Sequence, residues 1–183
     1  EVENEILSSK ICRCFDCRQV LYEESMFDGQ KVSKSRIITS VDYSMVSMEA
    51  FEIYAANHDI HVMDFVLKLD AYSYYMMNLL DYLIGNTDRH WGNWGFLVDN
   101  RTNQPVRLFD LMDLNQTFLA YDTPDGANCM TTGNRKMSQR EAAVEAVKKI
   151  GLNQRAEIKD EWFEGREKER EMFWCRFGIL KEQ

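Results

Sequence analysis

Residues Leu79–Thr117 read LLDYLIGNTDRHWGNWGFLVDNRTNQPVRLFDLMDLNQT, and the rest of the chain can be interpreted around this stretch. It begins with an apolar run that Gly85 and Asn86 interrupt, as expected where a helix ends in a loop. A cluster of polar side chains follows the break, made up of Asp88, His90 and Asn93. The stretch therefore predicts a helix that presents a polar loop.

Two short apolar segments follow the polar loop, Trp94–Val98 and Val106–Phe109. The residues between them are polar, and two β-prone runs around a polar turn are typical of a hairpin. The second segment ends directly on Asp110. The predicted order is helix, polar loop, strand, turn, strand and carboxylate, so Asp88, Asn93 and Asp110 are expected to converge at one end of the hairpin.

This order suits phosphoryl transfer. In that reaction one aspartate accepts the proton of the attacking hydroxyl, while an amide and a second aspartate hold the magnesium ions that bridge the phosphates. Asp88 and Asn93 have the D-x-x-x-x-N spacing of a kinase catalytic loop, and Asp110 follows the next hairpin, as a metal-holding aspartate does. Asp113 is the rival of Asp110 for the metal, and Asp110 is favoured because it directly ends the strand.

The chain resembles the kinase core of HipA-type proteins through the pattern Asn86-x-Asp88-x-His90-x-x-Asn93, followed by Phe109-Asp110-Leu111. These proteins are bacterial serine/threonine kinases, best known as toxins of toxin–antitoxin pairs. The same core is similar, more distantly, to that of phosphoinositide 3/4-kinases. The resemblance implies ATP- and magnesium-dependent transfer of the γ-phosphate to a Ser or Thr hydroxyl of a protein substrate, with an antitoxin-type protein as a further partner.

The resemblance also implies roles for individual residues. Asp88 is expected to be the catalytic base, and His90 is expected to orient the catalytic loop by hydrogen bonding, with a direct catalytic role for His90 as the alternative. Asn93 and Asp110 are expected to hold the magnesium ion and, with it, the nucleotide. For any one of these residues, the alternative is a polar loop that carries Asp, His and Asn without a chemical role.

A helix over Glu1–Phe15 is predicted from apolar residues at helical spacing. Its segment Asn4–Ile11 resembles the N-lobe helix of HipA-like kinases, and in kinases a glutamate on this helix pairs with a strand lysine that binds the phosphates. Glu5 is the first candidate for this cofactor-binding role, and Glu1 is the second. The open alternative is an exposed acid near a helix N-terminus, where negative charge is stabilising.

Residues 1–40 are interpreted as part of a kinase N-lobe. Two β-prone runs, at 19–26 and 31–39, flank Asp28-Gly29, which is a strong hairpin signal. A hinge would follow at 39–42. The sequence does not choose among the apolar candidates for an adenine pocket, which are Ile37, Ile38 and Val41. The Gly-rich loop and strand lysine of a kinase would precede the first helix, so the chain is expected to be a fragment with a truncated small lobe.

Residues 41–183 are interpreted as a mainly helical C-lobe, which completes an α+β, protein-kinase-like fold. The first helix of this lobe is expected to begin at Asp42 or Ser44 and to run to about Ala56. A long helix is predicted from His61 to Ile84 by its apolar stripe. Two further helices are predicted, one from the capping box Ser138-x-x-Glu141 to Gly151 and one from Gln154 to about Phe177.

The composition argues for some binding partners and one cellular compartment over others. The formal net charge of −8 argues against direct binding of nucleic acid or anionic membranes, since both attract a basic surface. No apolar run approaches the ~20 residues of a membrane span. The cysteines number five, which is odd, and three lie in Cys12-x-Cys14-x-x-Cys17. Free thiols in a cytoplasmic protein are therefore favoured over disulfides or a zinc site.

Three other functions fit parts of the pattern. A catalytically inactive kinase-like module would bind a nucleotide or a partner without phosphotransfer. A metal-dependent phosphoesterase would use Asp88, His90 and Asp110 around a transition metal, and it would need a further N or O ligand in space. A lipid kinase is less favoured, because the chain is acidic and carries no basic surface segment.

Overall fold

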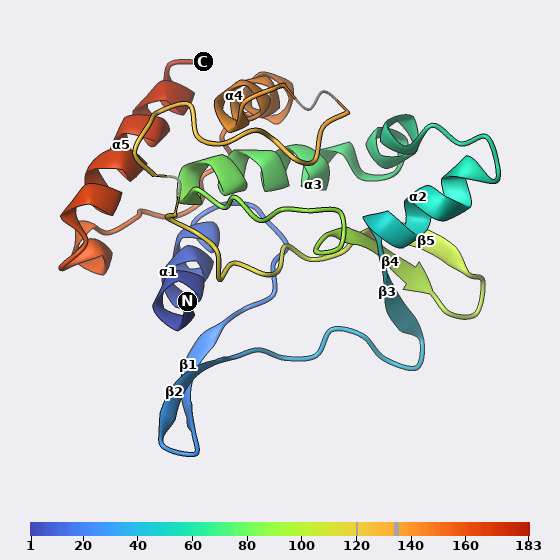
Figure 1. The fold of residues 1–183 in the computed structure, drawn as a ribbon, viewed down its shortest axis with the longest axis horizontal. Coiled ribbons are helices and arrows are strands. Elements are labelled where there is room, and N and C mark those ends of the chain that lie inside the picture. The colour runs from blue at the N-terminus through green and yellow to red at the C-terminus, as the bar shows by residue number, and fades with distance from the viewer. Residues whose placement is uncertain (120, 134–135) are drawn as a thin grey trace.

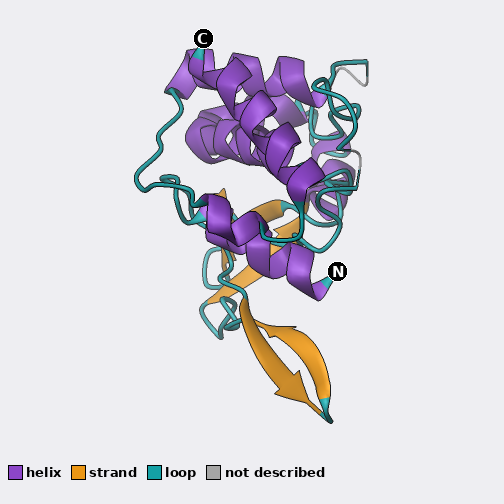
Figure 2. Cartoon of the chain, turned by 90° about the vertical axis from the view of Figure 1, so that its left-hand side faces the viewer, coloured by secondary structure: helices purple, strands orange, loops and turns teal. Residues whose placement is uncertain are grey.

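The structure is a computed structural model that describes residues 1–119, 121–133 and 136–183 (Figure 1). In chain order its helices and strands are α1 (Val2–Cys12), β1 (Glu23–Phe27), β2 (Gln30–Lys34), β3 (Tyr43–Ser47), α2 (Met48–Ala56), α3 (Val62–Ile84), β4 (Gly95–Asp99), β5 (Gln104–Leu108), α4 (Gln139–Ile150), the 3-10 helix η1 (Asp160–Phe163) and α5 (Glu167–Lys181). Figures 1 and 2 show most helices gathered at one end of the molecule, with the β1–β2 hairpin projecting from the other. No helix of the described chain is long and apolar enough to span a membrane.

The strands form two separate antiparallel sheets. One is the β1–β2 hairpin, and the other has the order β3-β4-β5. The hairpin predicted around Asp28-Gly29 is confirmed, because β1 and β2 pair directly across these two residues. Asp28 has φ 47° and Gly29 has φ 74°, the positive values that a two-residue hairpin turn of type I′ requires.

The helix predicted to begin at Asp42 or Ser44 is wrong at its start. The chain there forms strand β3, which pairs with β4 from Tyr43 opposite Asp99 to Ser47 opposite Gly95. Helix α2 begins only after it, and Ser47 Oγ accepts a hydrogen bond from the third residue beyond it at 3.2 Å. Pairing with a strand about fifty residues later supplies the backbone hydrogen bonds that a local helix would otherwise have made.

Helix α3 forms the centre of the larger part and covers the span of the helix predicted from His61 to Ile84, with a kink at Asp70 that the sequence did not predict. Residues 76–84 are all buried, so the predicted apolar stripe widens into a fully covered segment. Gly85 ends the helix with φ 61°, in the left-handed region that favours glycine. A Cβ atom on Gly85 would also collide with the ring of Tyr121. The polar loop therefore starts at a fixed point.

The C-terminal helices confirm one prediction and correct another. Helix α4 begins with the predicted capping box at Ser138 and Glu141. The single helix predicted over 154–177 is wrong, because η1 and α5 are separate elements. The segment before η1 pairs with the loop after α1 instead, and the Arg155 N–H donates to the Cys14 carbonyl at 2.7 Å. Those long-range bonds use backbone groups that a continuous helix would need.

Candidate active site

The polar loop leaves α3 through Asn86, which is fully buried. Its Nδ2 donates to Asp81 Oδ1 at 3.0 Å, and its Oδ1 accepts from the Asp88 N–H at 3.1 Å. Its backbone carbonyl accepts from Gln139 Nε2 at 2.5 Å. Asn86 thus joins the last turn of α3, the loop and the start of α4, and it fixes where the loop begins.

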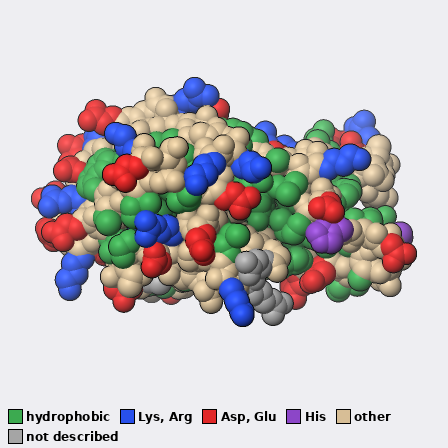
Figure 3. Space-filling view, turned by 90° about the horizontal axis from the view of Figure 1, so that it is seen from above, with side chains coloured by type: hydrophobic (Ala, Val, Ile, Leu, Met, Phe, Trp, Pro, Cys, Tyr) green, Lys and Arg blue, Asp and Glu red, His purple; other side chains and the backbone are tan. Residues whose placement is uncertain are grey.

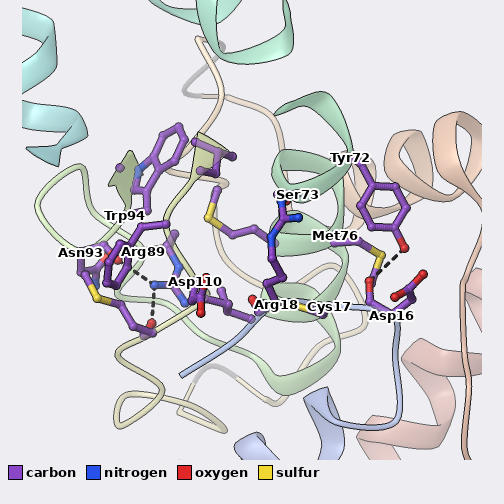
Figure 4. Close-up of a pocket in the computed structure, with 16 residues that line it drawn as sticks. Asp16, Cys17, Arg18, Tyr72, Ser73, Met76, Arg89, Asn93, Trp94 and Asp110 are labelled. Atoms are coloured by element: carbon purple, nitrogen blue, oxygen red, sulfur yellow. Dashed lines mark hydrogen bonds between the residues drawn. The ribbon is translucent and has the colours of Figure 1, made fainter. Parts of the chain in front are cut away.

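Arg89 is the central polar contact of the site and is buried with its partner Asp81. Its Nε and Nη2 donate to the two Asp81 carboxylate oxygens at 2.8 and 3.0 Å. Its Nη1 donates to the carbonyls of Asn93 at 3.1 Å and Met112 at 2.6 Å (Figure 4). Burial works to lower the pKa of Arg89, but the Asp81 carboxylate outweighs it and raises that pKa, so the guanidinium stays charged.

Asp88 lies half-buried within the loop. Its backbone carbonyl accepts from the Asn93 side-chain amide and, at 2.8 Å, from the His90 N–H. Among the described residues, no hydrogen bond or ion pair engages the Asp88 carboxylate. The carboxylate is therefore available to an incoming hydroxyl, as a catalytic base requires.

The structure brings Asn93 next to Asp113. Asn93 Nδ2 lies 3.5 Å from Asp113 Oδ2, and the Asn93 side chain is buried. The backbone N–H of Asp113 donates to the Tyr22 hydroxyl at 3.1 Å. Asp113 has φ 56°, a left-handed value that is uncommon outside glycine and tends to occur at functional positions. The amide and the carboxylate that could share a metal ion are thus Asn93 and Asp113.

Asp110, the carboxylate that the sequence favoured, lies in a different contact. Its Oδ1 accepts from Arg107 Nη1 at 2.5 Å. The backbone does not turn at Asp110 but continues along the segment before β1, where Leu111 N–H donates to the Arg18 carbonyl at 3.0 Å. Among the described residues, the Asn93 side chain thus contacts the carboxylate of Asp113, while Asp110 lines a cavity together with Asn93. The choice of Asp110 as the metal ligand stays a prediction.

His90 is exposed and makes a contact within the loop. Its Nδ1 accepts from the Gly92 N–H at 2.9 Å. A Cβ atom on Gly92 would lie 2.9 Å from the His90 ring, so this close approach depends on glycine. The contact is local to the loop, and a role of His90 in orienting it stays a prediction.

Glu5 on α1 is buried, with 8% of its surface exposed. The alternative of an exposed helix-N-terminal acid is therefore wrong for Glu5, whereas Glu1 is exposed. The Glu5 carboxylate accepts from the Ser33 hydroxyl of β2. It also lies near Tyr22: burial raises the pKa of the Tyr22 hydroxyl most, and the charges of Glu5 and Asp113 raise it further. Glu5, Tyr22 and Asp113 thus belong to one region.

The donor chemistry of the site fits a magnesium ion. Asp113 and Asn93 lie next to each other and each carries a side-chain oxygen, the hard type of ligand that magnesium prefers, although it is the Asn93 nitrogen Nδ2 that faces Asp113 Oδ2. Asn93 Oδ1 is buried and has no hydrogen-bond partner among the described residues, as expected of a ligand atom. Of the three apolar hinge candidates, Ile37 and Val41 are 87% and 92% exposed. Ile38 is half-buried and lines a surface cavity beside β2.

The comparisons with known proteins give a fold but no family. No protein-family model matches the sequence, and no curated protein matches it either. Among solved structures, the chain is similar to the Helicobacter pylori proinflammatory kinase CtkA, with a TM-score of 0.69 and 14% sequence identity. The similarity covers 98% of this chain and 80% of the other. At this identity it shows the fold alone, and it confirms the predicted α+β, kinase-like fold.

Proposed function

We propose that the chain is a HipA-like kinase core that transfers the γ-phosphate of ATP to a Ser or Thr hydroxyl of a protein substrate with magnesium. The observation that carries the proposal is the position of the Asn93 amide, between the Asp88 carbonyl and the Asp113 carboxylate. Arg89 stabilises this arrangement through hydrogen bonds to the Asp81 carboxylate and to the carbonyls of Asn93 and Met112. Phosphoryl transfer uses a base and metal-holding oxygens, and these contacts support the proposal by bringing the candidates for both together.

Each residue has a definite task in the proposal. Asp88 accepts the proton of the acceptor hydroxyl, because its carboxylate has no hydrogen-bond or ion-pair partner in the part of the chain that the structure describes. Asn93 and Asp113 hold the metal, and Glu5 lies where it can support the phosphate-binding side of the site. A bound magnesium–ATP complex would supply the phosphoryl group and neutralise the charge on its oxygens. The remaining contribution of the chain is positioning, which Asn86 and Arg89 provide.

The phosphoesterase alternative has less support. A transition-metal site of that kind needs several converging N or O ligands. Within the described residues, no group of three or more His, Cys, Asp or Glu side chains is placed to hold a metal ion. His90 also engages Gly92 through Nδ1. A catalytically inactive binding module would share the structural features of the kinase and differ only in lacking phosphotransfer. A phosphotransfer assay distinguishes the two.

Partners and compartment follow from the same proposal. We propose a protein substrate, an antitoxin-type protein as a further partner and a cytoplasmic location. The face seen in Figure 3 carries acidic and basic side chains side by side. Mixed charge of this kind, with a net charge of −8, favours a protein partner over nucleic acid or an anionic membrane.

Calorimetric titration of the chain with ATP, with and without magnesium, tests the proposal. We expect magnesium-dependent binding that Asp113→Asn weakens by at least about tenfold. Asp110→Asn is the matched control and should leave the affinity unchanged, since that carboxylate pairs with Arg107. A loss of binding in Asp110→Asn alone would restore Asp110 as the metal ligand. Absence of ATP binding to the parent chain would contradict the nucleotide site itself.

A further inference from the structure

The segment at 127–131 lies between β5 and α4, and its first residues are bonded to those that open α4. The Gln139 N–H donates to the Ala127 carbonyl at 2.8 Å, and the Cys129 N–H donates to the Met137 carbonyl at 2.8 Å. The Gln139 side chain also accepts from the Ala127 N–H at 3.0 Å. The segment therefore starts from a fixed point at the N-terminus of α4. None of the residues that the proposed phosphotransfer uses belongs to it.

Thr131 attaches the same segment to α3. It is buried, with 1% of its surface exposed, and its Oγ1 donates to Asn78 Oδ1 of the helix. Cys129 Sγ lies 3.3 Å from Thr131 Oγ1 and adds a second polar contact. The Tyr74 hydroxyl of α3 lies 3.5 Å from the Thr131 carbonyl. A buried acceptor that loses its donor is unfavourable, so the bond between Thr131 and Asn78 fixes the position of this residue on α3.

The carbonyl directly before Thr131 contacts the polar loop. The indole Nε1 of Trp91 donates to this carbonyl, that of Met130, at 3.0 Å. The Met130 carbonyl and the Thr131 nitrogen belong to one peptide unit, which is planar. A Thr131 side chain that is fixed on α3 therefore also restricts the direction in which the Met130 carbonyl points. Thr131 is thus connected to the polar loop through one rigid group and one hydrogen bond.

Trp91 lies between the proposed base and the proposed metal ligand in the loop. Backbone hydrogen bonds connect the two sides of Trp91, since the His90 N–H donates to the Asp88 carbonyl at 2.8 Å and the Asn93 N–H donates to the His90 carbonyl at 3.1 Å. The Trp91 carbonyl accepts from the Glu49 N–H of α2 at 2.9 Å. A displacement of Trp91 would therefore move the backbone that carries Asp88.

We propose that Thr131 is a positioning residue, which holds Trp91 through the carbonyl that it fixes and thereby sets the position of Asp88. The effect on phosphotransfer rests on the proposed function, because it takes Asp88 as the base. The Asn93 end of the loop is bonded separately, by Arg89 Nη1 at 3.1 Å. Loss of the Thr131 hydroxyl is therefore expected to impair turnover more than the binding of magnesium–ATP.

Hydrogen exchange of the Trp91 indole N–H with water, followed by NMR, tests the contact directly, and Trp91→Phe identifies the signal. Thr131→Val keeps the shape of the side chain but removes the hydroxyl, so the Trp91 indole is expected to exchange at least about tenfold faster. Thr131→Ser keeps the hydroxyl and should keep the parent rate. The Trp174 indole donates to Asp160 Oδ1 at 2.6 Å and is the internal control, whose rate should stay the same in both variants.

A second variant controls for a general loss of stability. Thr117 is also buried, and its Oγ1 accepts from Ser8 Oγ at 2.8 Å, so Thr117→Val likewise removes a buried, bonded hydroxyl. It should leave the exchange rate of the Trp91 indole unchanged. Magnesium-dependent ATP turnover, measured as ADP release with casein as a general Ser/Thr acceptor, tests the effect on catalysis. Thr131→Val is expected to lower kcat at least about tenfold and to change the KM for ATP by less than about twofold.

The inference is overturned if the Trp91 indole exchanges in Thr131→Val as it does in the parent, or if Thr117→Val accelerates that exchange equally. It is also overturned if Thr131→Ser behaves as Thr131→Val does, or if Thr131→Val leaves the kcat of an active parent unchanged. A parent chain without ATP turnover would contradict the proposed function, whereas the Trp91 signal would still support or overturn the contact assigned to Thr131.

Discussion

At the scale of single residues, Arg89 joins parts of the chain that lie far apart in sequence. Four of its hydrogen bonds reach α3, the end of the polar loop and the segment that leads to Asp113. Both charges of the Arg89–Asp81 pair are buried, with side-chain exposures of 3% and 5%. Such a pair holds geometry well because a buried charge that loses its partner is strongly unfavourable.

Arg89→Met is therefore expected to lower the free energy of unfolding by about 3–5 kcal/mol. The loss arises because Asp81 would remain buried without its counter-charge. Arg101→Met is the matched control: Arg101 pairs with Asp42 at 2.7 Å, but its side chain is 79% exposed. An exposed pair contributes about 0–1 kcal/mol, so the control should stay close to the parent. Urea unfolding of the three proteins measures both values, and equal losses in the two variants would contradict this account of Arg89.

The sequence identified Asp88 and Asn93 through their spacing, because a loop of fixed length limits how far apart two of its residues can lie. It could not show that Asp113 contacts Asn93 while Asp110 pairs with Arg107. The course of the chain there includes the Leu111–Arg18 backbone pairing, and nothing local predicts a contact over more than ninety residues. The pairing of Arg89 with the buried Asp81 was not predicted, for a related reason. The two residues are eight positions apart, and they meet only because the loop turns back onto α3.

At the scale of elements, Asp70 interrupts α3 within its predicted span. Its backbone has φ −155° and ψ 63°, which is not helical. Its Oδ1 accepts from the Ser73 N–H at 3.2 Å, as an N-cap does for a new helix. Its Oδ2 accepts from Arg18 at 2.7 Å and from the Leu108 N–H at 3.1 Å. Asp70 therefore bends the central helix and fastens it to β5 and to the segment after α1.

Asp70→Ala should lower the free energy of unfolding by about 2–4 kcal/mol, since it removes a helix cap and leaves the Leu108 N–H without its acceptor. Asp70→Asn keeps an acceptor oxygen for the cap and should lose less. Asp64→Ala, in the first turn of the same helix, changes a side chain that is 82% exposed and should cost under about 1 kcal/mol. Thermal and urea unfolding measure the series. A loss for Asp64→Ala as large as that for Asp70→Ala would show that Asp70 has no special role.

The elements that sequence patterns predicted correctly are those with local signals. The Asp28-Gly29 turn, the apolar stripe of α3 and the capping box of α4 all act within a few residues. Strand β3 and the break before α5 were missed, because each is stabilised by backbone pairing with a distant segment. The kink at Asp70 was missed for a different reason. Its side chain competes with the helix backbone, but only the contacts from Arg18 and Leu108 make that competition succeed.

At the scale of the whole molecule, the two sheets have unequal support. The β3-β4-β5 sheet adjoins α2 and α3, and its central strand is almost fully buried. The β1–β2 hairpin projects away from most of the helices (Figure 2). Its main contacts outside the hairpin are with α1. Met26 and Phe27 of the hairpin are 63% and 69% exposed. The β1–β2 hairpin is thus attached to the rest by little buried apolar surface.

Native-state hydrogen exchange should therefore show two levels of amide protection, low in the hairpin and high in the core. Amides of β1 and β2 are expected to exchange on the order of 100-fold or more faster than those in the buried C-terminal half of α3. An isolated two-stranded hairpin is marginally stable in water, so its opening needs little free energy, whereas the α3 amides should open only with the whole fold. The β4 amides serve as the internal control, since they also belong to a strand but lie in the core. Equal protection of the hairpin and of α3 would contradict this expectation. It would mean that the contact of β2 with α1, including the hydrogen bond from Ser33 to Glu5, makes the hairpin as stable against opening as the core.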